Sequence, residues 1–478
     1  MPLECAKVRT FVTHVVFRQM AVLALTFSCA ARAEVIRMKN GDAIYADRVV
    51  ETTNTVQYEI GDNSYIVPKS KVERVEAGAP APVRQSELPV YIPEAPANGE
   101  RELLEQVVRE GAVNREALNS IESRGNATVT AVAFYIAGKQ EFQSGKYAEA
   151  QRDFEVGMRY DPQNPAILNF YAALLLRTGN ARGAIEYAER AVRLAPDSPD
   201  AFAVQGFAQY AAGHPKDAAD SWKHSLALRP DASIQRLLDR VGRELTAESN
   251  YSERETGHFM LRYEGAQSSE AFRSQILSSL EASYGELAQG FGIEPHSSIQ
   301  VILYTNQAFF DVTQAPSWTG ALNDGKLRVP LQGLDSVTPD LARILKHELA
   351  HSFVNQITLG RCPLWLNEGI AQTMEPKSLA SHAARLGQLF QQEHEIPLNA
   401  LEGSFASFSA PEAALAYDES LATVEYIRST YGMSDVLRLL EKLGHGDSVE
   451  SALRSTVHSD YRQLQNEVGA FLVRQFGN

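Results

Sequence analysis

Cysteine is scarce in this sequence, which has 478 residues and only three cysteines, Cys5, Cys29 and Cys362. The first two lie in an N-terminal segment that we expect to be removed, so the mature chain would keep only Cys362. A single thiol excludes an internal disulfide, even in a compartment that permits one. Stability must therefore come from buried apolar surface and from any bound metal.

An excess of basic charge is also absent. Asp and Glu number 59 against 45 Lys and Arg, which gives a formal net charge of −14. Basic patches supply most of the affinity for nucleic acid, so this balance argues against such a partner. The sequence contains neither a glycine-rich phosphate loop nor a serine nucleophile elbow. Hydrophobic residues nevertheless make up 44% of the chain, which is enough for buried cores and excludes global disorder.

Long apolar runs are missing except near the N-terminus. Basic residues precede the run MAVLALTFSCAA, and the small tripeptide ARA overlaps its end. This order is typical of a Sec-type signal peptide over residues 1–33 with cleavage after Ala33, although an incorrectly assigned start would also leave such a run. The run is too short to span a bilayer, and the residues TFS before Cys29 fit a lipoprotein site poorly. We therefore expect a periplasmic or secreted protein without a stable membrane span.

Three short segments follow the predicted cleavage site. Between residues 34 and 76, apolar and polar residues alternate around turn signals such as Asn40-Gly41, which predicts a small β-module of four or five strands. Residues 77–100 are rich in proline and alanine and predict a linker. Residues 101–122 predict one polar helix.

A repeat with a period of 34 residues comes next. Prolines, glycines and alanines recur at this spacing in three registers: Pro162, Pro196 and Pro230; Gly145, Gly179 and Gly213; Ala150, Ala184 and Ala218. This period is that of the tetratricopeptide repeat (TPR), a pair of helices joined by a tight turn. We expect the glycine in the turn and the proline after the second helix. The predicted TPR region is 101–250, with repeats at 131–164, 165–198 and 199–232 and a solvating helix at 233–248.

Repeats of this kind stack into a superhelix with a concave surface. Such surfaces usually bind peptides or proteins, so we predict a protein partner here. Small residues at Gly138, Ala172 and Gly206 stand where one helix must approach its neighbour closely. The alternative is a helical spacer that has no ligand.

From residue 251 the pattern changes to strands alternating with helices, and residues 339–360 predict a long helix. This helix contains the pentapeptide His347-Glu348-Leu349-Ala350-His351. Residues four apart lie on one helix face, so His347 and His351 can bind one metal ion. Glu348 points aside, where it can reach a water on the metal. The spacing predicts a catalytic site with one Zn2+ ion.

A catalytic zinc site needs a third protein ligand and one open position. Glu368 follows His351 by 17 residues and lies at the start of a second predicted helix, introduced by Pro363. Antiparallel packing of the two helices would bring this carboxylate to the ion. We therefore predict His347, His351 and Glu368 as metal ligands and Glu348 as the catalytic base.

The two halves of this motif, HELAH and WLNEG, resemble the gluzincin metallopeptidases, and in particular the metallopeptidase-like domains of the peptidase MA superfamily. The resemblance covers roughly residues 255–475. It implies a zincin-like α+β domain over residues 251–478, in which two histidines and the downstream glutamate bind zinc. It also implies that Glu348 acts as general base on a water.

The resemblance implies two further parts of the site. An edge strand upstream of the metal helix holds extended substrate by backbone hydrogen bonds, and residues 319–331 (TGALNDGKLRVPL) are in the place for it. A tyrosine or histidine further downstream stabilises the oxyanion. Tyr417, which we expect together with Ser420 just before a helix, is the candidate. The alternative is a packed tyrosine at a helix start.

Two departures from the family pattern bear on activity. The aminopeptidase branch binds a free N-terminus through a Gly-x-Met-Glu-Asn motif that this sequence does not contain, so we expect an endopeptidase. Thermolysin-like enzymes place an aspartate four residues after the ligand glutamate, where it orients a metal histidine. Here that position is Gln372. Its amide oxygen would accept the same hydrogen bond more weakly, so we expect modest catalytic power.

The expected architecture is multidomain, with a small all-β module, an α-helical TPR solenoid and an α+β zincin-like metallopeptidase domain. The predicted function is a secreted or periplasmic zinc metallopeptidase that hydrolyses peptide bonds, with repeats that recruit a protein partner or substrate. One alternative is a non-catalytic TPR/zinc-fold binding protein in envelope assembly. Another is an enzyme that acts on non-peptide bonds such as cell-wall amides.

Overall fold

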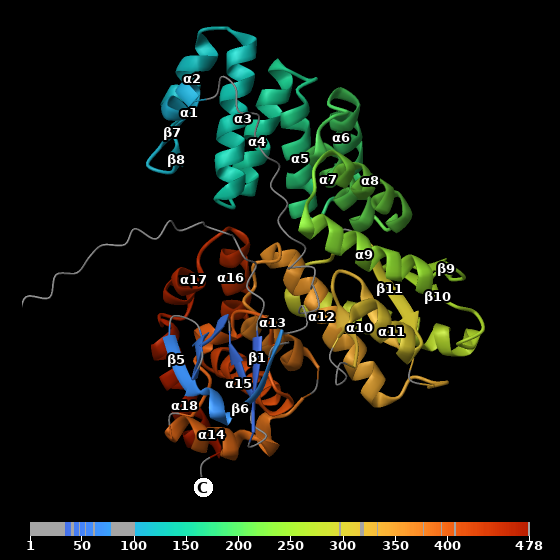
Figure 1. The fold of residues 1–478 in the computed structure, drawn as a ribbon, viewed down its shortest axis with the longest axis vertical. Helices are drawn as coiled ribbons and strands as arrows, with labels where there is room; N and C mark the ends of the chain where they lie inside the picture. The colour runs from blue at the N-terminus through green and yellow to red at the C-terminus, as the bar shows by residue number, and fades with distance from the viewer. Residues whose placement is uncertain are drawn as a thin grey trace, which may run out of the picture. The chain divides into compact units, whose positions relative to one another are not determined.

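The computed structural model describes residues 34–39, 43–46, 48–52, 54–60, 63–77, 101–295, 298–315, 320–331, 333–375, 377–392, 394–405 and 408–476. Contacts divide the chain into two compact units, Met1–Ala79 and Pro80–Asn478 (Figure 1). The predicted signal peptide and, apart from Ala77, the predicted linker lie outside the described residues.

The first unit contains two three-stranded antiparallel sheets, with strand orders β2-β1-β6 and β3-β4-β5. Ile36, Val56 and Val72 form its buried core. The prediction of four or five strands was too low, because the stretch around residues 43–51 supplies one strand to each sheet. The elements are β1 (Glu34–Met38), β2 (Ala43–Ala46), β3 (Arg48–Glu51), β4 (Thr55–Ile60), β5 (Asn63–Pro68), the 3-10 turn η1 (Lys69–Lys71) and β6 (Val72–Ala77).

The single helix predicted at 101–122 is wrong. The segment contains α1 (Arg101–Val107), a short hairpin of β7 (Val108–Arg109) and β8 (Ala112–Val113), and α2 (Arg115–Ser123). Glu110 and Gly111 form the hairpin turn with φ of 51° and 76°, a left-handed conformation that interrupts a helix. Asn114 then begins α2, because its side chain accepts a hydrogen bond from the Ala117 N–H at 3.2 Å.

Three helix pairs form the repeats. They are α3 (Ala127–Gln143) with α4 (Tyr147–Tyr160), α5 (Pro165–Arg177) with α6 (Ala181–Leu194), and α7 (Pro199–Ala211) with α8 (Pro215–Leu228). The turn glycines Gly145, Gly179 and Gly213 have φ of 76°, 80° and 90°, which confirms the turn position predicted from the period. The small residue Gly206 allows close packing, since a Cβ there would lie 2.4 Å from the Trp222 ring.

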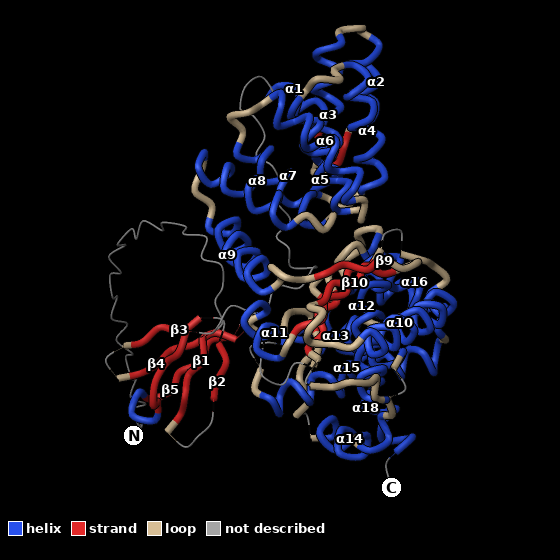
Figure 2. The backbone as a smooth tube through the Cα atoms, turned by 90° about the vertical axis from the view of Figure 1, so that its right-hand side faces the viewer, coloured by secondary structure: helices blue, strands red, loops and turns tan. Residues whose placement is uncertain are grey.

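Helix α9 (Ala232–Ala247) contacts α8 of the last repeat and α11 (Asn306–Thr313) of the following domain, as Figures 1 and 2 show. The domain has a five-stranded sheet of order β12-β13-β11-β10-β9, in which the three inner strands are parallel and both edge strands are antiparallel to their neighbours. Helix α10 (Glu270–Phe291) makes the crossover between two parallel strands. The strands are β9 (Ser252–Glu255), β10 (Phe259–Tyr263), β11 (Ile299–Tyr304), β12 (Leu322–Asn323) and β13 (Leu327–Pro330).

The rest of this domain is helical. Side chains from the sheet, from α10 and from the C-terminal helices share one hydrophobic core, which includes Phe259, Phe353, Trp365 and Leu472. This arrangement confirms the expected α+β class. The remaining elements are α12 (Pro339–Thr358), α13 (Leu364–Met374), η3 (Leu379–Ser381), α14 (Ala383–Gln391), η4 (Leu398–Leu401), α15 (Ala410–Tyr431), α16 (Met433–Gly444), α17 (Val449–Thr456) and α18 (Tyr461–Phe476).

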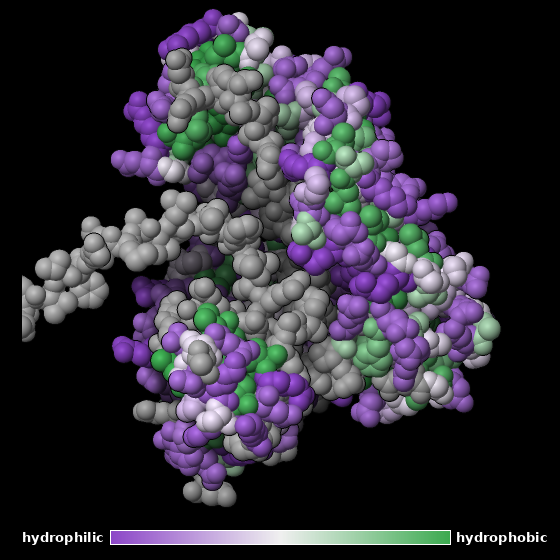
Figure 3. All heavy atoms as spheres, in the orientation of Figure 1, coloured by the Kyte–Doolittle hydropathy of each residue, from purple (hydrophilic) through white to green (hydrophobic). Residues whose placement is uncertain are grey.

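The coloured part of the face drawn in Figure 3 is mostly hydrophilic. On the face drawn in Figure 3, hydrophobic side chains form small patches between hydrophilic ones. Among the described residues, the large exposed hydrophobic side chains are Val50, Ile66, Leu104, Leu194 and Leu228. Within the same residues, no helix combines the length and the apolar character that a membrane span requires.

Candidate metal centre

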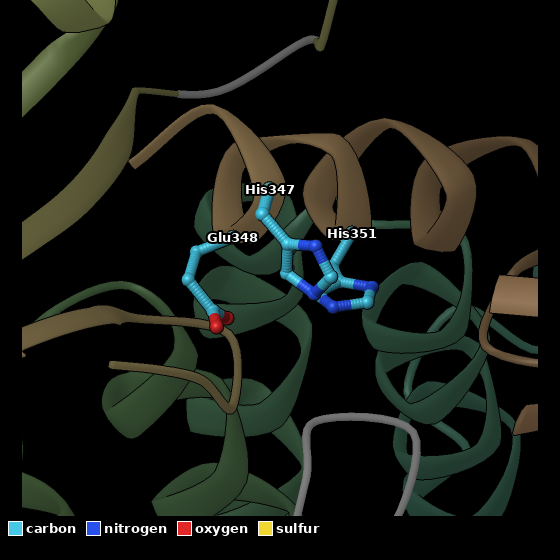
Figure 4. Close-up of side chains that lie close together, drawn as sticks. All are labelled: His347, Glu348 and His351. Carbon is cyan, nitrogen blue, oxygen red and sulfur yellow. The ribbon is translucent and has the colours of Figure 1, made fainter. Parts of the chain in front are cut away.

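Helix α12 carries the histidine pair. Its first turn is capped by the Thr338 side chain and begins with Pro339, both of which favour a helix start. Leu345 and other leucines on the helix are buried in the domain core, which fixes its rotation. His347 and His351 then project from the same side, with ring centroids 4.9 Å apart (Figure 4).

Glu368 on α13 brings a carboxylate to the same point. Its Oε2 lies 3.3 Å from His347 Nε2 and 3.7 Å from His351 Nε2. Ligand atoms arranged tetrahedrally at zinc distances are about 3.3–3.6 Å apart. The Glu368 side chain is only 1% exposed, a position in which a carboxylate needs a cation or strong hydrogen bonds. The structure therefore brings the three predicted ligands together at a spacing that suits zinc.

Each histidine has a second partner on its other ring nitrogen. His351 Nδ1 lies 2.8 Å from Oδ1 of Asn367, an atom that only accepts hydrogen bonds. The proton is therefore assigned to Nδ1, and Nε2 keeps its lone pair for a metal. His347 Nδ1 lies 3.4 Å from Oε1 of Glu375, and Arg343 Nη1 donates to Oε2 of this carboxylate at 2.6 Å.

The charges around His347 favour a cation at this place. Burial lowers the pKa of His347. The carboxylates of Glu368 and Glu375 and the charge of Glu348 raise it by a larger amount, so that the pKa is about 10 instead of the ordinary 6.5. Without a metal, the ring therefore holds a proton at neutral pH. A buried set of nitrogen and oxygen donors that attracts positive charge in this way fits Zn2+.

Glu348 lies beside the histidine pair rather than between its rings (Figure 4). One carboxylate oxygen is within 4.8 Å of ring nitrogens of both histidines. Adjacent residues on a helix point about 100° apart, so Glu348 cannot share the direction of His347. Glu368 Oε2 lies 3.3 Å and 3.7 Å from the two Nε2 atoms, and the side position of Glu348 suits a base that acts on a water.

The hydrogen bond expected from Gln372 to a metal histidine is not made. Gln372 Nε2 donates to the Tyr417 carbonyl at 2.8 Å, and its Oε1 accepts from Lys377 Nζ at 2.5 Å. The expectation was wrong because α13 directs Gln372 toward α15. The carboxylate that faces His347 Nδ1 is that of Glu375.

Two of these neighbouring residues were not found from the sequence. Asn367 stands directly before Glu368 in the WLNEG segment, so its position there was an available signal. Glu375 follows the last residue of α13, where helical spacing no longer predicts the direction of a side chain. No sequence signal indicated it.

Tyr417 lies inside α15 together with Ser420, not before a helix as expected. Its ring packs edge-on against Phe405, with centroids 5.5 Å apart, and its carbonyl accepts the hydrogen bond from Gln372. Helices α13 and α15 are in direct contact, so Tyr417 is on the helix next to Glu368. Its action on an oxyanion stays a prediction.

Gly369 makes the contact between these two helices possible. A Cβ at this position would lie 2.3 Å from the Ser420 carbonyl oxygen and 2.5 Å from Val424 Cγ2. Only glycine allows so close an approach. Because Glu368 is the adjacent residue, this packing also fixes where the carboxylate lies along α12.

The strand expected beside the metal helix is present. Strand β12 is the edge of the sheet within the described residues, and Asn323 at its end contacts α12. Asn323 Nδ2 donates to the Glu348 carbonyl at 2.6 Å and to Ser352 Oγ at 2.7 Å. The edge strand is thus attached to the helix turn that carries the histidine pair.

Comparisons with known proteins agree with this organisation. Residues 281–474 match the family model of the Peptidase MA superfamily, and residues 141–206 match that of the tetratricopeptide repeat. These matches confirm the predicted combination of repeats with a metallopeptidase-like domain. No curated protein matches the chain.

Two solved structures are similar to a quarter of the chain. The first TPR of Spaghetti (RPAP3) bound to an HSP90 peptide is 25% identical, with a TM-score of 0.25, and the match covers 25% of this chain and 95% of that one. The first TPR domain of the human RPAP3 protein is 26% identical, with a TM-score of 0.24 and the same shares.

Proposed function

We propose that this chain, which carries a Peptidase MA superfamily domain behind tetratricopeptide repeats, is an exported zinc-dependent endopeptidase. The observation that carries the proposal is the approach of Glu368 Oε2 to His347 Nε2 at 3.3 Å and to His351 Nε2 at 3.7 Å. Glu348 at their side supplies the base. Export rests on the N-terminal segment, which has the order of a signal peptide.

In the proposed reaction, zinc held by these residues would polarise the scissile carbonyl and lower the pKa of a water toward 7. Glu348 accepts a proton from the water as the water oxygen attacks the carbonyl carbon. Glu348 then gives this proton to the leaving amine nitrogen as the C–N bond breaks. Tyr417 donates a hydrogen bond to the oxyanion. Asn367 and Glu375 hold the histidine rings so that both Nε2 atoms face the ligand position.

The substrate proposed for this site is an extended stretch of polypeptide. Its backbone would add to the sheet at β12, next to α12, by main-chain hydrogen bonds. The repeats would recruit the substrate protein or a partner through their concave surface. Main-chain hydrogen bonds do not depend on the sequence of the substrate. Selectivity would therefore come only from pockets that receive every second side chain of the substrate.

Zinc content and peptide cleavage of the mature chain test this proposal together. We expect one zinc per wild-type chain, one in Glu348→Gln and none in His347→Ala, measured by elemental analysis. Cleavage of a peptide library should fall by about 10²- to 10⁴-fold in Glu348→Gln, because the base is lost while the metal stays.

Each other outcome has a distinct meaning. Loss of zinc in Glu348→Gln would show that the ligands are wrongly assigned. A wild-type chain that binds zinc but cleaves no peptide would favour a non-catalytic binding protein. Release of fragments from a cell-wall digest, without peptide cleavage, would favour an enzyme for other amides.

A further inference from the structure

A buried charged cluster joins α9 to the hairpin formed by β12 and β13. We call it the α9–hairpin cluster. Arg328 at its centre is 0% exposed and Glu244 is 1% exposed, although both are charged. Its members are Arg240, Glu244 and Glu248 on or next to α9, and Asp324, Lys326 and Arg328 on the hairpin.

Arg328 makes most of the contacts in this cluster. Its guanidinium donates to Asp324 Oδ2 at 2.9 Å, to Glu244 Oε1 at 2.5 Å and to the hydroxyl of Tyr304 at 2.7 Å. Lys326 Nζ lies 3.2 Å from the other oxygen of Glu244. Glu244 is therefore bonded to two hairpin residues, Lys326 and Arg328, that are more than 80 residues away in the sequence.

The six named members are three cations and three carboxylates. Arg262 adds a further cation beside Glu248 and also pairs with the more exposed Glu253. Burial would raise the pKa of Glu244, but Arg328, Lys326 and Arg240 hold it well below its ordinary value. Glu244 therefore stays ionised. The cost of burying these charges is met by their mutual contacts, and breaking one pair would leave a buried charge without compensation.

Such a network is a poor way to gain stability, because apolar residues of similar volume stabilise a core as well or better. What charged partners add is a fixed relative orientation of the two elements that carry them. An arginine fork binds a carboxylate in one orientation, so the cluster fixes the hairpin in register against α9.

Two adjacent residues of the hairpin connect this cluster to α12. Asp324 pairs with Arg240 of α9, and the preceding residue Asn323 donates to the Glu348 carbonyl and to Ser352. The edge strand is therefore held from two sides, by α9 of the repeat region and by α12 of the metal centre.

We propose that α9 holds β12 in its position against α12, a role that we call the strut. Glu244 is then a positioning residue for substrate binding. This inference rests on the proposed peptidase function for its kinetic consequence. A peptide that adds to β12 gains the same contacts in the ground state and in the transition state. Loss of the strut therefore raises KM and leaves kcat nearly unchanged.

The test compares Glu244→Gln with Asp200→Asn in the full mature chain. Asp200 pairs with Arg229 at 2.6 Å inside the repeats, so its variant removes a partly buried ion pair that does not touch the hairpin. We expect Glu244→Gln to raise KM for a library-selected peptide about tenfold, with kcat within twofold and zinc content unchanged. Amide hydrogen exchange over residues 320–331 should become about tenfold faster. Asp200→Asn should change none of these values.

Equal exchange at 320–331 in wild type and Glu244→Gln would overturn the strut, as would equal changes in both variants. If the wild-type chain cleaves no peptide, the proposed function fails, and the exchange measurement alone decides the inference. If Glu244→Gln does not fold, Lys326→Met supplies the same measurements. It removes one cation from Glu244, together with the contact of Lys326 Nζ with the Tyr210 ring, 3.9 Å from the ring centroid.

Discussion

At the scale of single residues, Glu375 is the part of the candidate metal centre that lies outside the HELAH and WLNEG motifs. It faces His347 Nδ1 at 3.4 Å and is itself held by Arg343. We expect Glu375→Gln to lower zinc affinity about 10- to 100-fold, because the ligand loses the carboxylate that orients it and raises its basicity. Competition with a chromophoric zinc chelator would measure this change.

The control for this prediction is Glu286→Gln. Glu286 also pairs with a cation on α12, Lys346, at 2.5 Å, but it does not contact a histidine. Its loss should leave zinc affinity as in the wild type. A similar loss in both variants would mean that α12 is disturbed as a whole and that Glu375 has no particular role.

Glu419 gives a pH-dependent prediction away from the ligands. Burial raises its pKa to about 8 from an ordinary value of 4.5; the Ile396 N–H opposes this, and Glu395 and Asp418 add to it. Between these pH values the folded chain keeps a proton that the unfolded chain releases, so the free energy of unfolding falls as pH rises.

Glu419→Gln removes this dependence, because the amide stays neutral and its oxygen still accepts from Ile396. At pH 8.5 we expect the variant to be more stable than the wild type by roughly 3–5 kcal/mol. At pH 4.5 the two should be nearly equal. Urea unfolding at both pH values measures this, and a difference that does not change with pH would contradict it.

The residues that the sequence could predict are those that lie at helical spacing in one element or directly beside a motif. His347, His351 and Glu348 needed only the turn of a helix, and Glu368 needed two neighbouring helices. Glu375 could not be predicted, because it follows the end of α13 and its partner Arg343 comes from another helix.

At the scale of elements, the packing of α13 on α15 depends on one glycine. A methyl group at Gly369 would meet the main chain of Ser420 at 2.3 Å, so the helices must separate. We expect Gly369→Ala to cost about 1–3 kcal/mol of stability by overpacking, and to weaken zinc binding because Glu368 moves with α13. Thermal unfolding and zinc competition would measure both effects.

Gly285 supplies the matched control. It lies inside α10 of the same domain, and a Cβ there would have no neighbour within 4 Å. Alanine has the higher helix propensity, so Gly285→Ala should keep zinc affinity and stabilise the chain by up to about 1 kcal/mol. A loss of zinc affinity in Gly285→Ala equal to that in Gly369→Ala would remove the packing argument.

Elements were predictable where one local signal dominated. The period of 34 placed the turn glycines, since only a residue free of a Cβ adopts φ near 80° easily. The helix predicted at 101–122 failed because Glu110 is a non-glycine residue with positive φ, which composition does not reveal. In the first unit, the change of sheet between β2 and β3 has no signature in alternating polarity.

At the scale of the whole molecule, the domain boundary predicted at residue 251 separates the two halves of the α9–hairpin cluster in the sequence. Helix α9 lies before this boundary and the β12–β13 hairpin lies after it. The sequence could not predict this contact. Charged residues on a helix and charged residues on a strand each predict a solvent-exposed face, and only the folded chain brings the two sets together. Arg328 is nevertheless 0% exposed. The repeat region and the metallopeptidase-like domain therefore share a buried network and are not independent at this point.

A pair of truncated chains tests this dependence. The chain 199–478 keeps α7 to α9 and the whole cluster, whereas 251–478 keeps Arg328 and Lys326 without Glu244 and Glu248. We expect 251–478 to be less stable by about 3–5 kcal/mol in urea, because buried cations lose their partners. Arg328→Met should stabilise 251–478, since it removes a charge that has lost partners, and should destabilise 199–478, where it breaks intact pairs. The same sign of change in both chains would show that the network does not connect the two regions.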